Sequence, residues 1–287
     1  MPDRVEVPAP AKVNLRLRIL AREESGYHQL ETVFCAIGLA DRVVVARGEA
    51  GIRLEVEGGV DVGPPERNLA VRAAERFHRE MGIAPAVDLH LAKHIPAAAG
   101  LGGGSSDAAA VLRALNELHG DPLPRAALLQ LAIELGADVP FFLCGSPLAL
   151  AWGRGERLLP LPPLPPRPVL VAHPGAAMPT AEAFREVAAQ RGGGYVPEAA
   201  LIDPDALRSW EGVAQLTRND FEPVVLRRIP SLAAGLAAMR DAGARISLLA
   251  GSGSSIFAIF DSAHALSSAS DRLNALGMRT WSAETAG

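Results

Sequence analysis

The sequence predicts an α/β protein (α+β) with two domains. Its 287 residues are 49% hydrophobic, which is enough to build two cores. Strand-like and helix-like patterns are mixed along both halves of the chain. Six prolines within residues 158–168 predict a stiff, extended connector between the halves. We therefore expect one domain over residues 1–163 and a second over residues 164–287.

The first domain is predicted to contain strands with helices inserted between them. Apolar and polar side chains alternate over residues 13–20, 52–57 and 87–91, the pattern of strands with one buried face, and residues 42–46 read as another strand. Asn68 is expected to cap a helix that ends at Met81, before Gly82. Further helices are expected from Ala108 to Leu118 and over residues 125–135.

The second domain shows a different order of elements. A loop is expected at Gly192–Gly194. The order β-α-α-β-β-α-β suits a small sheet with helices on one face, in the ferredoxin-like manner. The strands are predicted at 169–172, 246–249, 256–260 and 279–282, and the helices at 181–190, 231–241 and 263–276.

Residues 96–107, with the sequence PAAAGLGGGSSD, form the most informative segment, here named the first glycine loop. Glycines let the backbone curl so that several N–H groups point to one place. The start of the following helix adds its positive end to that place. The segment therefore predicts a polyphosphate site, and nucleotide chemistry is the leading interpretation.

Other patterns fit the first glycine loop less well. A Walker loop needs a lysine before its serine, and Gly104 is followed directly by Ser105 and Ser106. A dinucleotide-binding loop needs a third glycine where Ser105 stands, and a fully buried strand before it. A flexible linker is the remaining alternative, but linkers seldom join a strand to a strong helix.

Phosphoryl transfer also needs a group that orients and deprotonates the acceptor hydroxyl. Asp138 is the best candidate, because Pro140 ends the preceding helix and holds the carboxylate on a constrained turn. Lys12 lies at the entrance of an apolar strand, where it could reach a phosphate or a carboxylate. Taken alone, Asp138 is more often a turn residue and Lys12 more often an ordinary charge at a strand end.

The first glycine loop resembles that of the GHMP kinases, with Pro96, Gly100-Leu-Gly102 and Ser105-Ser106 at matching positions. Further segments resemble the branch of that family that phosphorylates 4-diphosphocytidyl-2-C-methyl-D-erythritol. The resemblance spans nearly the whole chain. It implies an N-terminal domain like ribosomal protein S5 domain 2 and a C-terminal ferredoxin-like domain. The matching segments are 10–15, 26–34, 67–69, 136–142, 218–223 and 251–255, of which Gly26-Tyr27-His28 separates this branch from other GHMP kinases.

The resemblance also implies roles for single residues. Lys12 and Asp138 match the catalytic pair, with Asp138 as the base. Substrate contacts are implied for Asn14, Tyr27, His28 and Thr180, although residues 172–180 follow the family pattern only loosely. ATP contacts are implied for Asn68, Lys93, Pro96, Ala97, Ala98, Ala99, Gly100, Leu101, Gly102, Gly103, Gly104, Ser105 and Ser106.

A second glycine loop, residues 251–255, is expected to bring backbone N–H groups toward the phosphates or to close the active-site cleft expected between the two domains. A plain hairpin loop is the alternative. It contains Gly251, Ser252, Gly253 and Ser254, and Ala250 before it is smaller than the family pattern prefers. The resemblance implies ATP as co-substrate and Mg²⁺ as its metal. The metal ligands are not assigned, with Ser105 and Ser106 as candidates.

Composition narrows the possible partners. A net charge of −4 and a pI near 6.0 argue against a nucleic-acid surface, so a small-molecule substrate is expected. Cys35 and Cys144 are expected to be buried thiols. No signal peptide or membrane span is recognisable, which predicts a cytoplasmic protein. A monomer or a homodimer is expected, and the sequence leaves both open. The open alternatives are a GHMP kinase acting on mevalonate or a sugar, a nucleotide sensor without a catalytic pair, and a structural protein.

Overall fold

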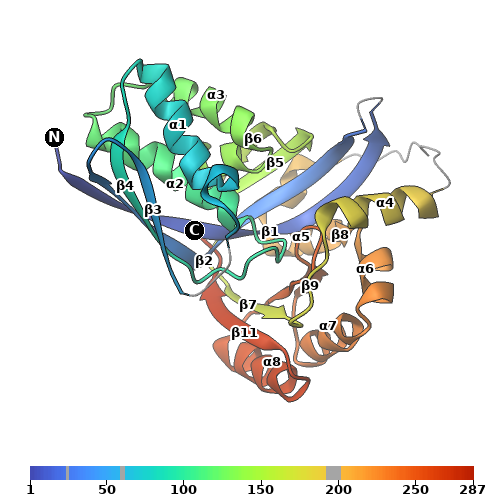
Figure 1. The fold of residues 1–287 in the computed structure, drawn as a ribbon. Coiled ribbons are helices and arrows are strands. Elements are labelled where there is room, and N and C mark those ends of the chain that lie inside the picture. Colours follow the sequence, from blue (N-terminus) through green and yellow to red (C-terminus); the bar gives the residue numbers. More distant parts are fainter. Residues whose placement is uncertain (24–25, 59–61, 192–201) are drawn as a thin grey trace. The chain divides into compact units, whose positions relative to one another are not determined.

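The computed structural model describes residues 1–23, 26–58, 62–191 and 202–287. They form two compact units. The first unit comprises residues 1–11, 40–97 and 102–145, and the second comprises 12–39, 98–101 and 146–287. The predicted α/β architecture is confirmed (Figure 1). The boundary after residue 163 stays a prediction, and the predicted loop at Gly192–Gly194 lies outside the described residues.

Two long strands, β1 (Arg4–Arg22) and β2 (His28–Arg47), contribute residues to both units. In the first unit, β4 (Ala86–Ala92) pairs antiparallel with the second half of β2 and parallel with β3 (Gly51–Glu57). The alternation expected for β4 is present, since Val87, Leu89 and Leu91 are buried. This strand leads directly into the first glycine loop.

Three α-helices of the first unit pack on one apolar core with these strands. Asn68 caps α1 (Leu69–Met81) through a bond from the Ala70 N–H, and Gly82 ends it in the left-handed conformation, as predicted. The other helices are α2 (Gly103–Leu118) and α3 (Arg125–Leu135), with short 3-10 turns η1 (Pro65–Arg67) and η2 (Val139–Leu143).

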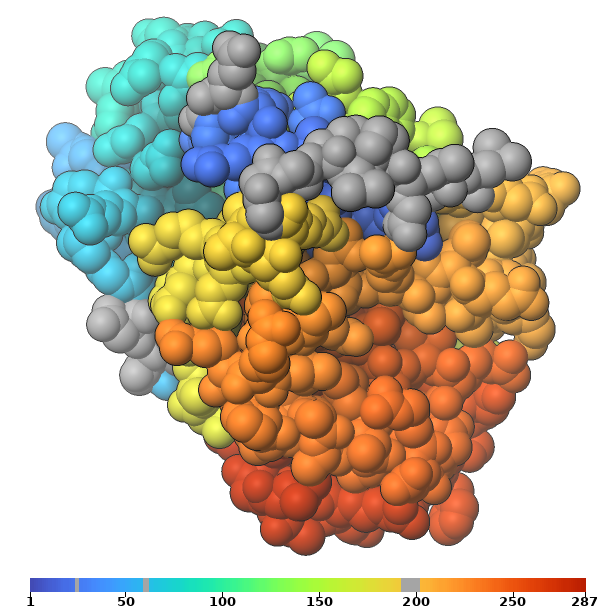
Figure 2. Space-filling model, turned by 90° about the vertical axis from the view of Figure 1, so that its right-hand side faces the viewer, coloured from blue at the N-terminus to red at the C-terminus, as the bar shows by residue number. Residues whose placement is uncertain are grey.

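The second unit contains a four-stranded antiparallel sheet with the order β11-β7-β10-β9. Its strands are β7 (Pro168–His173), β9 (Ile246–Leu249), β10 (Ile256–Ile259) and β11 (Arg279–Glu284). If these four strands are numbered 1 to 4 along the chain, their order across the sheet is 4-1-3-2. This is the ferredoxin-like arrangement that the sequence predicts. The predicted helices are also present as α4 (Thr180–Gln190), α7 (Ser231–Asp241) and α8 (Ala263–Ala275), and they pack on one core with the sheet. Residues of α4, yellow in Figure 2, lie at the surface beside orange residues of the helices that follow.

Several elements of the second unit are not predicted from the sequence. They are β5 (Leu148–Gly153), β6 (Arg157–Leu161), η3 (Pro204–Arg208), α5 (Trp210–Leu216), β8 (Arg218–Asn219) and α6 (Glu222–Arg228). β6 corrects the predicted connector, because residues 158–161 pair with β5 instead of running free. Among the described strands β6 pairs with β5 alone, and an edge strand tolerates Pro160 because its missing N–H is not needed there.

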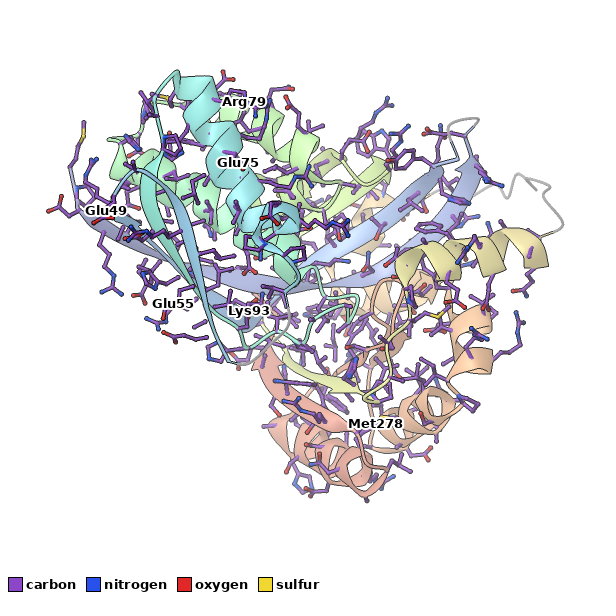
Figure 3. All side chains as sticks on the ribbon, in the orientation of Figure 1. Glu49, Glu55, Glu75, Arg79, Lys93 and Met278 are labelled. Atoms are coloured by element: carbon purple, nitrogen blue, oxygen red, sulfur yellow. The ribbon has the colours of Figure 1, made fainter. Side chains whose placement is uncertain are left out.

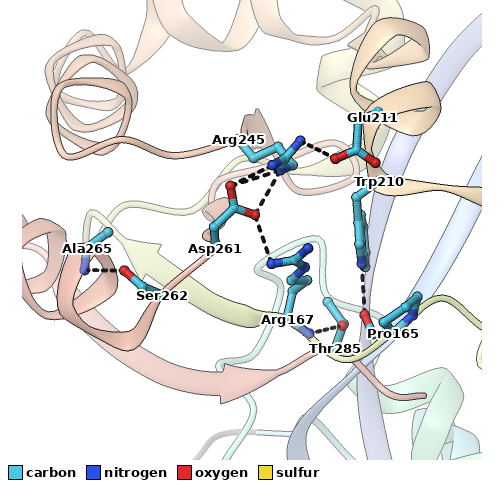
Figure 4. A network of polar contacts seen from close by, with 9 residues as sticks. All are labelled: Pro165, Arg167, Trp210, Glu211, Arg245, Asp261, Ser262, Ala265 and Thr285. Atoms are coloured by element: carbon cyan, nitrogen blue, oxygen red, sulfur yellow. Dashed lines mark hydrogen bonds and ion pairs between the residues drawn. The ribbon is translucent and has the colours of Figure 1, made fainter.

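The later part of the proline-rich segment is held by a polar network (Figure 4). The Trp210 Nε1–H donates to the Pro165 carbonyl at 2.8 Å. Asp261 accepts from Arg245 at 2.6 Å and forms an ion pair with Arg167 at 3.0 Å. These charges are partly exposed, so each pair stabilises the fold only slightly. The network therefore fixes the path of the segment more than it adds to stability. No helix in the described ranges is both long and apolar enough to cross a bilayer.

Candidate active site

The first glycine loop has the curled backbone that its composition predicts. Ala98, Gly100 and Gly102 have φ angles of 51°, 79° and 74°, all in the left-handed region. Helix α2 then begins at Gly103, earlier than the predicted start at Ala108. Residues 103–106 are therefore its first turn. The Ser106 N–H donates to the Gly102 carbonyl at 2.9 Å, so the N–H groups of Gly103, Gly104 and Ser105 precede the first helical bond. Such an end favours a bound anion.

Two polar atoms at this helix start are buried without a hydrogen-bond partner among the described residues. They are the Ser106 Oγ and the Asp107 Oδ1. Burying an oxygen without a partner costs about 1–3 kcal/mol, which a bound ligand could offset. The described residues contain no cluster of three or more His, Cys, Asp or Glu that could hold a metal. A magnesium ion here would depend on one or two protein oxygens together with phosphates, as Mg²⁺ sites usually do.

A buried ion triad holds the two ends of the first glycine loop together. The Lys93 Nζ, at the end of β4 (Figure 3), donates to Asp107 at 2.6 Å and to Asp41. The other Asp41 oxygen accepts from the N–H groups of His94 at 2.5 Å and Ile95 at 2.8 Å. Asp41 thus fixes the residues that enter the loop, and Lys93 links them to the helix that leaves it.

The triad has one positive and two potentially negative groups, all almost completely buried. Burial raises the pKa of Asp107 to about 6; Lys93 opposes this rise and Asp41 adds to it. Burial alone would lower the pKa of Lys93, but Asp107 and Asp41 outweigh it and raise the pKa. The Lys93 ammonium therefore stays charged and is committed to the two carboxylates. Its predicted contact with ATP remains a prediction.

Lys12 is 4% exposed and starts a chain of hydrogen bonds in the second unit. Its Nζ donates to the Asn14 Oδ1 at 2.8 Å, and the Asn14 Nδ2 donates to the Thr32 Oγ1 at 2.7 Å. Thr32 in turn donates to the Arg16 carbonyl at 2.7 Å. The Lys12 Nζ also lies 5.2 Å from the Phe34 ring centroid, a cation–π distance. Two residues predicted to act on substrate are thus in direct contact, and their side chains are held in fixed positions.

The backbone joins Lys12 to the first glycine loop. The Lys12 N–H donates to the Leu101 carbonyl at 2.9 Å. Because β1 is buried at both Lys12 and Asn14, this bond fixes residue 101 against a rigid strand. The predicted lysine and part of the predicted phosphate loop are therefore neighbours.

Asp138 lies in the first unit, directly before η2, with φ −85° and ψ −17°. Its side chain is half-buried and does not cap η2, while Val139 and Pro140 behind it are buried. The carboxylate therefore sits on the constrained turn that the sequence predicts. Its partnership with Lys12 remains a prediction.

Tyr27 and His28 have different surroundings. Tyr27 is 59% exposed, and the Arg154 guanidinium lies 4.0 Å from its ring centroid. His28 stacks on Phe184 of α4, with ring centroids 4.5 Å apart and an angle of 17° between the planes. Burial, with smaller contributions from Arg22 and Arg191, lowers the pKa of His28. The imidazole is therefore neutral at pH 7 and can both donate and accept a hydrogen bond.

The second glycine loop lies directly against part of the first. A Cβ on Gly100 would come within 2.0 Å of the Ala250 carbonyl oxygen, and one on Gly251 within 2.8 Å of the Gly100 oxygen. The Ser255 N–H donates to the Ala99 carbonyl at 3.3 Å. Glycine is required at both contacts because the two backbones touch.

Side chains around the second glycine loop hold it in place. The hydroxyls of Thr180 and Ser252 share a hydrogen bond of 2.9 Å. Ser254 donates to the Ala176 carbonyl and lies 3.1 Å from the His173 Nε2. The structure thus places Thr180 beside this loop, whereas its predicted substrate contact is untested. Asn68 uses its side-chain oxygen to cap α1, so any contact with ATP would come from its remaining groups.

Sequence reasoning missed three residues that shape these sites. Asp41 and Phe184 meet their partners through distant segments, and no local pattern marks them. Asn219 lies in the matched segment 218–223, and its side chain binds the second glycine loop. The match of segment 218–223 to the family is the sequence feature from which Asn219 could have been found.

Comparison with known proteins identifies the family. The model described as "GHMP kinases N terminal domain" matches residues 68–146, and "GHMP kinases C terminal" matches residues 198–277. A 4-diphosphocytidyl-2-C-methyl-D-erythritol kinase of Geobacter sp. (strain M21) is 39% identical over 264 residues, covering 91% of each chain. One from Deinococcus radiodurans is 41% identical and covers 88% of this chain and 82% of the relative.

Solved structures agree with these matches. A crystal structure of 4-(cytidine 5'-diphospho)-2C-methyl-D-erythritol kinase superposes with a TM-score of 0.81 at 39% identity, covering 99% of this chain and 100% of that chain. Homoserine kinase from Cytophaga hutchinsonii superposes with a TM-score of 0.75 at 21% identity, covering 100% and 95%, which shows a shared fold. The chain therefore belongs to the GHMP kinases and, within them, to the 4-diphosphocytidyl-2-C-methyl-D-erythritol kinase family.

Proposed function

We propose that this protein transfers the γ-phosphate of ATP to the 2-hydroxyl of 4-diphosphocytidyl-2-C-methyl-D-erythritol, a step in the non-mevalonate pathway to isoprenoid precursors. Its relatives carry the name of this activity at about 40% identity over most of the chain. We place the reaction in the cytoplasm, with a monomer or homodimer that needs no nucleic acid or membrane.

The observation that carries the proposal is the position of Lys12. Its buried ammonium donates to Asn14, and its backbone N–H bonds to Leu101 in the first glycine loop. The rigid strand that carries this buried cation is thus bonded to a loop suited to phosphates. Developing negative charge on a transferred phosphoryl group is stabilised by a positioned cation of this kind.

Asp138 would accept the proton of the acceptor hydroxyl as its oxygen attacks the γ-phosphorus. The bond from that phosphorus to the bridging β-phosphate oxygen breaks, and ADP leaves. Lys12 would keep Asp138 ionised and steady the attacking oxygen. A positioned base contributes about 100- to 10,000-fold to such a rate.

The first glycine loop would hold the triphosphate through the N–H groups at the start of α2. The unpartnered Ser106 Oγ, and the Asp107 Oδ1 beside it, suit a Mg²⁺ ion bound with the phosphates. When bound, this ion would neutralise charge on the β- and γ-phosphates. The contacts of Lys93 with Asp41 and with Asp107 would keep both ends of the loop fixed during binding.

Tyr27, His28, Asn14 and Thr180 would contact the cytidine substrate. The Tyr27 ring would stack on the pyrimidine, a contact worth about 1–3 kcal/mol per base, while Phe184 holds the His28 ring by stacking on it. The neutral imidazole can read the donor and acceptor groups of the base edge. Mevalonate and homoserine have no base, so these contacts would favour the cytidine substrate over them.

The test is a comparison of acceptors. Purified protein with ATP and Mg²⁺ is given the cytidine diphosphate substrate, mevalonate, homoserine or galactose, and ADP release is followed together with phosphorylated product. We expect turnover with the cytidine substrate alone. No turnover with that substrate, or faster turnover with another acceptor, would refute the assignment.

A further inference from the structure

We infer that Asn219 is a positioning residue that holds the two glycine loops in the shape needed for the triphosphate. The inference rests on the ATP site proposed above and adds to it. Asn219 is 4% exposed and belongs to the Arg218–Pro223 motif. Its side chain binds the second glycine loop, so its action would pass through the loops.

The Asn219 side chain clamps the start of the second glycine loop. Its Nδ2 donates to the carbonyls of Leu249 and Gly251, both at 2.8 Å. Its Oδ1 accepts from the Phe221 N–H at 2.9 Å, which fixes the orientation of the amide. Glu222 adds a bond of 2.8 Å from the Leu249 N–H to its Oε1. The Leu249–Ala250 and Gly251–Ser252 peptide groups are therefore held from one short segment.

That segment is itself anchored to the strand that carries Lys12. β8 pairs parallel with β1, with Leu17 opposite Asn219. The Asp220 N–H donates to the Leu17 carbonyl at 3.0 Å, and the Asp220 Oδ2 accepts from the Ile19 N–H at 2.8 Å. The clamp is thus fixed to a rigid part of the second unit.

The Ala250–Gly251 peptide, which lies between the two held peptide groups, is the one that touches the first glycine loop. The Ala250 and Gly100 backbones are so close that a Cβ on Gly100 would lie 2.0 Å from the Ala250 oxygen. A shift of the Gly251 carbonyl away from Asn219 would move Ala250 and release Gly100. Residues 98–101 would then lose the backbone that packs against them. The first glycine loop would no longer be held in the conformation proposed to bind phosphate.

The test compares Asn219→Asp with wild type. Aspartate keeps the volume and the acceptor for the Phe221 N–H, but it cannot donate to the two carbonyls. We expect Kd for a non-hydrolysable ATP analogue and KM for ATP to rise about 10-fold, because two hydrogen bonds that preset the loop are lost. KM for the acceptor substrate should rise less than KM for ATP, since the proposed acceptor contacts at Asn14, Tyr27 and His28 lie outside the two glycine loops.

Asn116 is a matched control. It is also a buried asparagine, whose Nδ2 donates to the Leu123 carbonyl at 3.0 Å and whose Oδ1 accepts from the Leu123 N–H at 3.0 Å. Asn116→Asp should lower thermal stability without changing Kd for the analogue. Equal weakening in both variants, or unchanged Kd in folded Asn219→Asp, would overturn the inference.

A second variant covers the case in which Asn219→Asp does not fold. Glu222→Ala removes the bond from the Leu249 N–H while Asn219 keeps its own bonds, and it should raise Kd for the analogue by about threefold. An unchanged Kd would contradict the clamp. Analogue binding needs no acceptor, so this result is separate from the proposed function. If wild type binds the analogue but phosphorylates no cytidine substrate, the function fails while the clamp remains testable.

Discussion

Glycines in the first glycine loop are needed for two different reasons, one set by the fold and one set by the proposed ligand. At Gly100 the fold demands glycine, because φ is +79° and a Cβ would strike the Ala250 oxygen. At Gly104 it does not, because this residue is exposed within α2 and a Cβ there would meet nothing within 4 Å. A glycine that the fold does not need, in a loop proposed to bind phosphate, points to close approach of a ligand.

Gly104→Ala should therefore separate binding from folding. We expect an unchanged or slightly higher melting temperature, because alanine favours the helix by up to about 1 kcal/mol. ATP affinity should fall about 10-fold, since the methyl group would crowd a phosphate. Gly100→Ala should instead lower the melting temperature strongly. Calorimetry with and without an ATP analogue measures both, and full ATP affinity in Gly104→Ala would contradict this account.

At the scale of elements, Asp220 joins β1, β8 and the end of α4. It accepts from the Ile19 N–H, from Arg191 at 2.7 Å and from Arg218 at 2.7 Å, and its side chain is 4% exposed. Burial alone would raise the pKa of this carboxyl. The Ile19 N–H, Arg191 and Arg218 outweigh burial and lower the pKa below its ordinary value of 3.8.

A carboxyl with a lowered pKa in the folded state gives a definite pH dependence. Its contribution to stability is complete above the unfolded-state pKa and disappears as the pH falls through the folded-state pKa. Asp220→Asn should reduce the free energy of unfolding by about 2 kcal/mol at pH 7, because charged hydrogen bonds are lost. Below pH 4 the difference should shrink. Urea unfolding at pH 7 and pH 3 measures this, and a constant difference would rule it out.

At the scale of the whole molecule, local signals explain what the sequence could predict. The cap at Asn68, the stop at Gly82 and the alternation in β4 each depend on residues a few positions apart. From these signals most helices, many strands and the ferredoxin-like order of the second unit can be predicted. The short elements β8, α5 and α6 have no such pattern and depend on tertiary contacts.

The candidate site follows the same division. Lys12, Asp138 and the first glycine loop are recognisable from motifs, and the bond from Lys12 to Asn14 joins near neighbours in the chain. Asp41 is not recognisable, because its partners Lys93 and Ile95 lie more than fifty positions away. Whether a charged side chain is buried and paired depends on which distant segments pack together. No local sequence pattern shows which segments do so.

The central claim is that Asp138 deprotonates the acceptor hydroxyl while Lys12 supports the transfer. Its most direct test is ³¹P NMR of the reaction of wild type and Asp138→Asn with ATP, Mg²⁺ and 4-diphosphocytidyl-2-C-methyl-D-erythritol, alongside calorimetry of ATP-analogue binding. We predict a new phosphomonoester signal with wild type, a rate at least about 100-fold lower with the variant, and equal analogue affinity for both. Phosphomonoester formation by Asp138→Asn at the wild-type rate would contradict the account.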